Sequence, residues 1–150
     1  MVKKMYTLEL KNNLSELDRL CQHCEEIGQA IGVTDKAIFE MNLALDELFT
    51  NIISYGFQDK QEHTIKINIS IEGGLLEIRI EDDGIPFNPI QSKAPDFQCG
   101  IEECKIGGLG IHLIKKLMDD IRYQRVADKN ILFLRRKIPD EFFKNKLGNC

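Results

Sequence analysis

A carboxylate and an amide lie four positions apart in the segment "LALDELFTNIISYGF", which covers residues 43–57. Apolar residues recur around Glu47 and Asn51 at helical spacing, so both side chains would border the apolar stripe of a helix. A helix carries such a pair where it faces a cleft at the edge of a core, and a carboxylate in a cleft is a candidate proton acceptor. A neutral pair on a solvated flank has the same spacing.

A second carboxylate ends a predicted strand in "LLEIRIEDDG", residues 75–84. Strand side chains alternate between faces, so Asp82 continues the apolar row of Leu76, Ile78 and Ile80, whereas Asp83 falls among the exposed charges. An inward carboxylate needs partners, because burying it unpaired is costly. Alternatively, "DDG" is already a turn, or Asp82 accepts hydrogen bonds from backbone N–H groups.

Three glycines open a predicted helix in "IGGLGIHLI", residues 106–114. Gly107, Gly108 and Gly110 would let a ligand approach the backbone closely, and the free N–H groups of a first helical turn attract anions. The segment matches neither the phosphate-binding P-loop pattern nor a complete dinucleotide fingerprint. A hinge or a close packing contact would need the same residues.

The elements that must position these groups follow from hydrophobic periodicity and turn residues. Helices cluster between antiparallel strands, which predicts an α+β sandwich rather than a doubly wound fold. Residues 88–107 have no sustained periodicity, and an irregular segment of about twenty residues within a compact domain is usually a functional lid or a disordered loop. The predicted elements are a strand (6–10), helices (13–32 and 34–54), a hairpin (64–71 and 75–82), the irregular segment (88–107), a helix (109–120), a hairpin (121–126 and 131–138, turn 127–130) and an unassigned tail (139–150).

Composition narrows the class of protein. A chain of 150 residues with net charge −4 and pI near 5.4 indicates one domain, with no electrostatic preference for nucleic acid or an anionic membrane. The basic N-terminus has no apolar signal core, so we expect a cytoplasmic protein. Five cysteines (Cys21, Cys24, Cys99, Cys104 and Cys150) favour reduced thiols, and the alternative is a zinc site built on Cys21 and Cys24.

Together, "ELFTNIISYGF", "DDGIPF" and "GGLGIHLI", with a long loop before the third, resemble the nucleotide-binding boxes of the GHKL (Bergerat-fold) ATPases. Within that superfamily the chain is similar to the small stand-alone anti-sigma factors that are also serine/threonine protein kinases. The resemblance covers about residues 3–137 of a single domain, 1–150, with an ATP lid at about 88–107. It implies a two-layer sandwich whose mixed, mostly antiparallel sheet is covered on one face by about three helices.

The resemblance also implies roles for individual residues. Glu47 would act as general base, and Asn51 would bind the Mg²⁺ that bridges the phosphates of ATP. Asp82 would accept a hydrogen bond from the adenine amino group, and Gly84 would let the chain turn against the purine. Backbone donors at the third box would meet the phosphates; these residues are Gly107, Gly108 and Gly110.

The implied function is that of an ATP–Mg²⁺-dependent anti-sigma regulatory factor. It would bind a sigma factor or similar regulator and phosphorylate a small antagonist protein on serine or threonine. The resemblance also implies a homodimer. The alternatives are an ATP-responsive binding module without phosphotransfer and a detached histidine-kinase-like ATPase domain. Two residues depart from the family pattern: Tyr55 replaces a histidine of the first box, and Pro86 replaces a glycine of the second. No arginine lies close before the glycines of the third box, where Lys105 is the nearest cation.

Overall fold

The computed structural model describes residues 2–91 and 107–144, and for residues 107–109 it describes the backbone alone. Three helices and five strands make up this part of the chain. They follow one another as β1 (Lys4–Lys11), α1 (Leu17–Ile31), α2 (Asp35–Tyr55), β2 (Thr64–Glu72), β3 (Leu75–Asp82), α3 (Gly107–Leu117), β4 (Asp120–Val126) and β5 (Lys129–Lys137).

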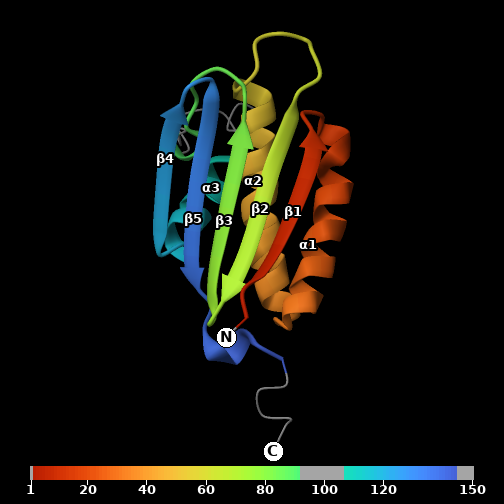
Figure 1. The fold of residues 1–150 in the computed structure, drawn as a ribbon, viewed down its shortest axis with the longest axis vertical. Coiled ribbons are helices and arrows are strands. Elements are labelled where there is room, and N and C mark those ends of the chain that lie inside the picture. Colours follow the sequence, from red (N-terminus) through yellow and green to blue (C-terminus); the bar gives the residue numbers. More distant parts are fainter. Residues whose placement is uncertain (1, 92–106, 145–150) are drawn as a thin grey trace, which may run out of the picture.

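The strands form one sheet in the order β1-β2-β3-β5-β4, and the three helices cover one of its faces (Figure 1). The α+β two-layer prediction is therefore confirmed. The prediction of a mixed sheet needs one correction: every strand pair among the described residues is antiparallel. Each of these strands runs opposite to its neighbours, because α3 carries the chain between β3 and β4 and a hairpin then places β5 between them.

Helix α2 is the central helix of the layer and begins where its sequence predicts. The Thr34 hydroxyl accepts a hydrogen bond from the Ala37 N–H at 3.4 Å, which satisfies one of the free donors of the first turn. Its buried stripe includes Leu45, Leu48 and Ile52. The helix is thus held by burial along most of its length, so its remaining polar side chains are fixed in position relative to the sheet.

The sheet face toward the helices carries the alternating apolar residues. In β2 these are Ile65, Ile67, Ile69 and Ile71, all buried, and in β3 the same row ends in Asp82. The hairpin between these strands turns at Gly73 and Gly74, which have φ of 58° and 81°. Glycine reaches such angles at little steric cost, and they suit a two-residue hairpin turn.

The second hairpin is tighter than its sequence suggests. Val126 pairs with Lys129, so the turn is Ala127 and Asp128, with Ala127 at φ 54°, rather than residues 127–130. Two residues predicted as turn therefore belong to β5, including Asn130. The preceding helix also ends earlier than predicted, at Leu117, because β4 already begins to pair with β5 at Asp120.

The tail was unassigned from sequence, and its first part packs on the helical layer. Residues Asp140–Phe142 form a short 3₁₀ turn, and Phe143 makes a β-bridge with Val33 in the connection between α1 and α2. Thr34 N–H donates to the Phe142 carbonyl at 2.8 Å. Among the described residues, no helix is long and apolar enough to cross a bilayer.

Candidate functional site

The end of α2 contacts the end of β3 through two glycines. The Ile85 N–H donates to the Gly56 carbonyl at 2.8 Å, and a Cβ placed on Gly84 would lie 2.1 Å from that same oxygen. Such a contact excludes any side chain at Gly84, because real Cβ atoms do not approach an oxygen so closely. The first and second predicted boxes are therefore neighbours in space, joined backbone to backbone.

Asp82 is buried at this junction, with 4% of its surface exposed, as its position in the apolar row predicts. Its Oδ1 accepts hydrogen bonds from the Gly84 N–H and from the Asn130 side chain, each at 2.9 Å. Burial raises the pKa of Asp82, and these two donors oppose that rise because they favour the ionised form. The Arg125 guanidinium, which donates to the Gly84 carbonyl at 2.7 Å, opposes it further.

Glu47 lies in the contact between α2 and α3. A Cβ placed on Gly110 would lie 2.5 Å from Glu47 Cγ and 2.7 Å from Cδ, so the two helices approach this closely because residue 110 has no side chain. Among the described residues, Glu47 Oε1 is buried without a hydrogen-bond partner. Burial raises the pKa of Glu47, the charge of Asp46 raises it further, and the Asn51 amide partly offsets the increase.

Asn51 is 8% exposed and follows Glu47 by one turn of α2. With a rise of about 1.5 Å per residue, Asn51 stands about 7.5 Å and Glu47 about 13.5 Å along the helix from Gly56, where α2 meets the Asp82 junction. Along the direction of α2, the Glu47 carboxylate comes first, the Asn51 amide second, and the junction with Asp82 of β3 last. A nucleotide lying along the helix with its base at Asp82 would extend its phosphates toward Asn51 and Glu47.

The predicted glycines divide between two roles. Helix α3 begins at Gly107, so the N–H groups of Gly107 and Gly108 are among the first-turn donors that have no acceptor within the helix, whereas Gly110 lies one position beyond these donors. Gly110 provides a close packing contact between helices, which the glycine-rich sequence predicts as the alternative to ligand binding. Of the predicted lid, Pro89–Gln91 form a 3₁₀ turn, while Lys105 and the rest of 92–106 lie outside the described residues.

Two side chains near Asp82, at what we call the base end of the site, have no role predicted from the sequence. Asn130 was assigned to a turn, although extending the alternation of Leu132 and Leu134 by one step places it on the buried face. Tyr55, which stands in place of the family's histidine, packs against the Phe87 ring with 6.0 Å between centroids.

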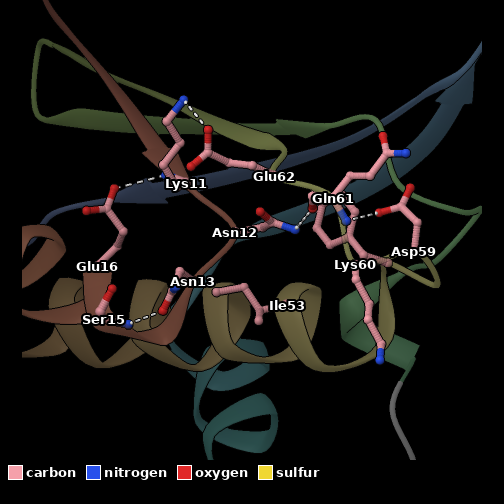
Figure 2. A pocket seen from close by; sticks show the side chains of 11 residues that line it. Lys11, Asn12, Asn13, Ser15, Glu16, Ile53, Asp59, Lys60, Gln61 and Glu62 are labelled. Carbon is pink, nitrogen blue, oxygen red and sulfur yellow. Dashed lines mark hydrogen bonds and ion pairs between the residues drawn. The ribbon is translucent and has the colours of Figure 1, made fainter.

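A separate hollow of about 480 Å³ lies where β1 ends beside the connection between α2 and β2 (Figure 2). Its polar groups bond to one another: the Asn12 amide donates to the Gln61 carbonyl, and Gln61 N–H donates to Asp59. Lys11 pairs with Glu62 across it at 3.4 Å. None of the predicted site residues lines this hollow, and its internal bonds hold two connections together.

The described cysteines are free thiols. Cys21 is exposed and Cys24 is buried, and burial raises the pKa of Cys24 to about 12, which keeps it protonated and unreactive. Among the described residues, no cluster of three His, Cys, Asp or Glu side chains could hold a metal ion. The remaining three cysteines lie outside the described residues.

Comparison with known proteins shows which family the chain belongs to. Residues 10–136 match the profile of the family described as histidine kinase-like ATPase domain. The chain belongs to that family. Serine-protein kinase RsbW of Listeria innocua is 30% identical over 101 residues, and this alignment spans 64% of each protein. Serine/threonine-protein kinase BtrW of Bordetella bronchiseptica is 25% identical over 134 residues, which cover 89% of this chain and 94% of BtrW.

A solved structure shares the fold of the family. The blue-light activated histidine kinase of Erythrobacter litoralis EL346 superimposes with a TM-score of 0.51 at 16% identity, covering 89% of this chain and 42% of that protein. The predicted family resemblance and the predicted fold class are thus both confirmed.

The residues present fit the ATP that the family name implies, and they also fit the Mg²⁺ that usually accompanies ATP. Mg²⁺ takes one or two protein ligands when it is bound to phosphates, so a single amide oxygen at Asn51 suffices and no acidic cluster is required. Glu47 Oε1, which has no hydrogen-bond partner among the described residues, lies one helical turn from that amide on α2, and Gly110 of α3 packs against the same side chain.

Proposed function

We propose that this protein is an ATP–Mg²⁺-dependent serine/threonine protein kinase and anti-sigma regulatory factor. It binds a sigma factor or similar regulator and phosphorylates a small antagonist protein. The relatives that carry the name serine-protein kinase support the reaction type. The chain spans 64% of the length of the RsbW relatives that it matches, so the antagonist, the regulator and homodimer formation all belong to the proposal.

In this proposal ATP supplies the phosphoryl group that is transferred, and the Mg²⁺ bound with it would neutralise the negative charge of the phosphates. Glu47 accepts the proton of the serine hydroxyl as the oxygen attacks the terminal phosphorus and ADP leaves. Asn51 would hold the Mg²⁺, Asp82 would accept a hydrogen bond from the adenine amino group, and Gly84 would let the base lie against the backbone. The first turn of α3 would donate backbone N–H groups to the phosphates, from Gly107 and Gly108.

The observation that carries the proposal is the buried Oε1 of Glu47 beside Gly110; this oxygen has no hydrogen-bond partner in the part of the chain that the structure describes. A buried carboxylate oxygen without a partner lowers the folding stability of the ligand-free protein, so its presence is explained best by a proton or a polar ligand that arrives with substrate. The raised pKa of Glu47 suits this task, because a general base works best with a pKa near the operating pH.

The reaction is tested with γ-labelled ATP, Mg²⁺ and candidate antagonist proteins. Acid-stable label on a partner serine or threonine supports a kinase. Acid-labile label indicates a histidine-kinase-like activity instead. Saturable ATP binding without any transfer to a protein indicates a nucleotide-responsive binding module.

Asp82→Ala tests the base site separately from the chemistry. Losing a hydrogen bond to a charged group costs about 1.5–3 kcal/mol, so ATP affinity should fall roughly 10- to 100-fold. Asp83→Ala is the matched control, since this neighbouring carboxylate bonds to His63 on the other side of the strand. ATP titrating equally well into Asp82→Ala would reject the adenine assignment.

A further inference from the structure

Asn130 is the most highly connected buried polar side chain of the base end, with 3% of its surface exposed. It lies in β5 directly opposite Asp82 in β3. Its Nδ2 donates to Asp82 Oδ1 at 2.9 Å and to the Ile85 carbonyl at 2.7 Å. Its Oδ1 accepts from the Phe87 N–H at 3.2 Å and from the Tyr123 hydroxyl.

These four bonds fix which way the amide faces. Asn130 uses both N–H donors and both lone pairs of its oxygen, so its hydrogen-bonding capacity is filled. Rotating the amide by half a turn would place its oxygen against a carboxylate and a carbonyl, and its NH₂ against the Phe87 N–H. The N–H group that faces Asp82 is therefore determined by the loop after β3 and by Tyr123 of β4, and not by Asp82 alone.

The Asn130 N–H group that donates to Asp82 influences whether Asp82 offers a ligand a hydrogen-bond acceptor or a protonated donor. Burial and the charge of Asp83 favour the protonated carboxyl, whereas the Asn130 and Gly84 donors and the Arg125 guanidinium favour the ionised one. His63 partly balances Asp83, because its ring bonds to that carboxylate at 2.9 Å. Both hydrogen bonds that Asp82 accepts from described residues end on Oδ1, and we infer that Oδ2 accepts the bond from a ligand.

We propose that Asn130 is a positioning residue that sets the base selectivity of the cleft. By holding Asp82 as a hydrogen-bond acceptor, it makes the site prefer a purine with an amino group at position 6 over one with a carbonyl there. A 6-amino group donates to the carboxylate, whereas a 6-carbonyl oxygen would face it lone pair to lone pair. This inference rests on the proposed nucleotide-binding function and adds a residue outside the three nucleotide boxes.

The test compares ATP with inosine triphosphate, which has a carbonyl at position 6, and measures both dissociation constants with Mg²⁺ present. Asn130→Asp has nearly the same shape but replaces the donor by a second carboxyl, so the two carboxyls share a proton and Asp82 is no longer held as an acceptor. The preference for ATP over inosine triphosphate should fall by about 10- to 100-fold. Gln124→Glu, which adds the same charge to the exposed face of β4, should leave the preference unchanged.

A purely structural role for Asn130 predicts a different result. Loosening the cleft would weaken both nucleotides by the same factor, so an unchanged ratio in folded Asn130→Asp overturns the proposal. If that variant does not fold, Asn130→Val removes the same donor with a side chain that suits a strand, and the same criterion applies. Wild-type protein that binds neither nucleotide rejects the proposed function itself, whereas wild-type selectivity that survives both substitutions rejects the inference about Asn130 alone.

Discussion

Replacing Glu47 by glutamine should make the protein inactive and, at neutral pH, more stable. The substitution keeps the shape of the side chain and removes the proton acceptor, so phosphate transfer should fall roughly 10²–10⁴-fold while ATP still binds. The same change removes a charge that burial disfavours, as the raised pKa of Glu47 indicates. Loss of activity with a gain in stability is expected where a functional group is held in an unfavourable environment.

The size of the stability gain follows from the unpartnered Oε1. Glutamine leaves a polar atom at the same place, so the substitution removes only the extra cost of the charge. An unsatisfied group costs about 1–3 kcal/mol and more when it is charged, and because the Glu47 side chain is only partly buried we expect the extra cost to be about 1 kcal/mol. A gain of about 1 kcal/mol corresponds to about 2–4 °C in the midpoint of thermal unfolding for a chain of this size. Because the folded-state pKa is raised, the gain should be present above that pKa and shrink as the pH falls through it, where wild-type Glu47 is neutral as well.

The assay pairs thermal unfolding over a pH series with single-turnover transfer of labelled phosphate. Glu40→Gln is the matched control on the same helix, because Glu40 Oε1 accepts from Arg136 Nη2 at 3.0 Å in a buried ion pair. That variant should keep its transfer rate and lose about 1.5–3 kcal/mol of stability. A Glu47→Gln protein that is less stable than wild type at pH 7, or that transfers phosphate at the wild-type rate, would refute this reasoning.

Three further outcomes follow from the contacts of this site and its surroundings. Gly110→Ala should destabilise the fold by about 1–3 kcal/mol in chemical denaturation and reduce ATP binding, since the added Cβ would lie 2.5 Å from Glu47 Cγ; unaltered stability would contradict the close contact. Asp46→Asn should move the acidic limb of the pH–rate profile to lower pH, because the charge of Asp46 raises the pKa of Glu47; an unmoved limb would remove Asp46 from the account. His63→Gln should lower the midpoint of thermal unfolding at about pH 6 but not at about pH 9. The hydrogen bond to Asp59 raises the folded-state pKa of His63, so the protonated ring stabilises the fold at low pH and this stabilisation is lost as the pH rises through that pKa. An equal loss at both pH values would show that the ring acts by packing alone.

Periodicity and turn residues were enough for most of the elements. The alternation of β3 predicted both its bounds and the inward position of Asp82, because a pleated strand leaves no other choice of face. The capping residue Thr34 and the terminal Gly56 placed the two ends of α2 to within a residue. Predictions were wrong where tertiary pairing competed with local preference, as at the end of α3, where strand pairing begins at Asp120.

The sequence by itself determined which groups exist and how they are spaced along one element: Glu47 and Asn51 one turn apart, and Asp82 in an apolar row. These relations depend on the local geometry of helix and strand, which repeats over a few residues. Only the tertiary structure decided that Gly56 meets Gly84 and that Asn130 faces Asp82 across 48 residues of chain. Such contacts depend on how β5 enters the sheet beside β3, and no local spacing carries that information.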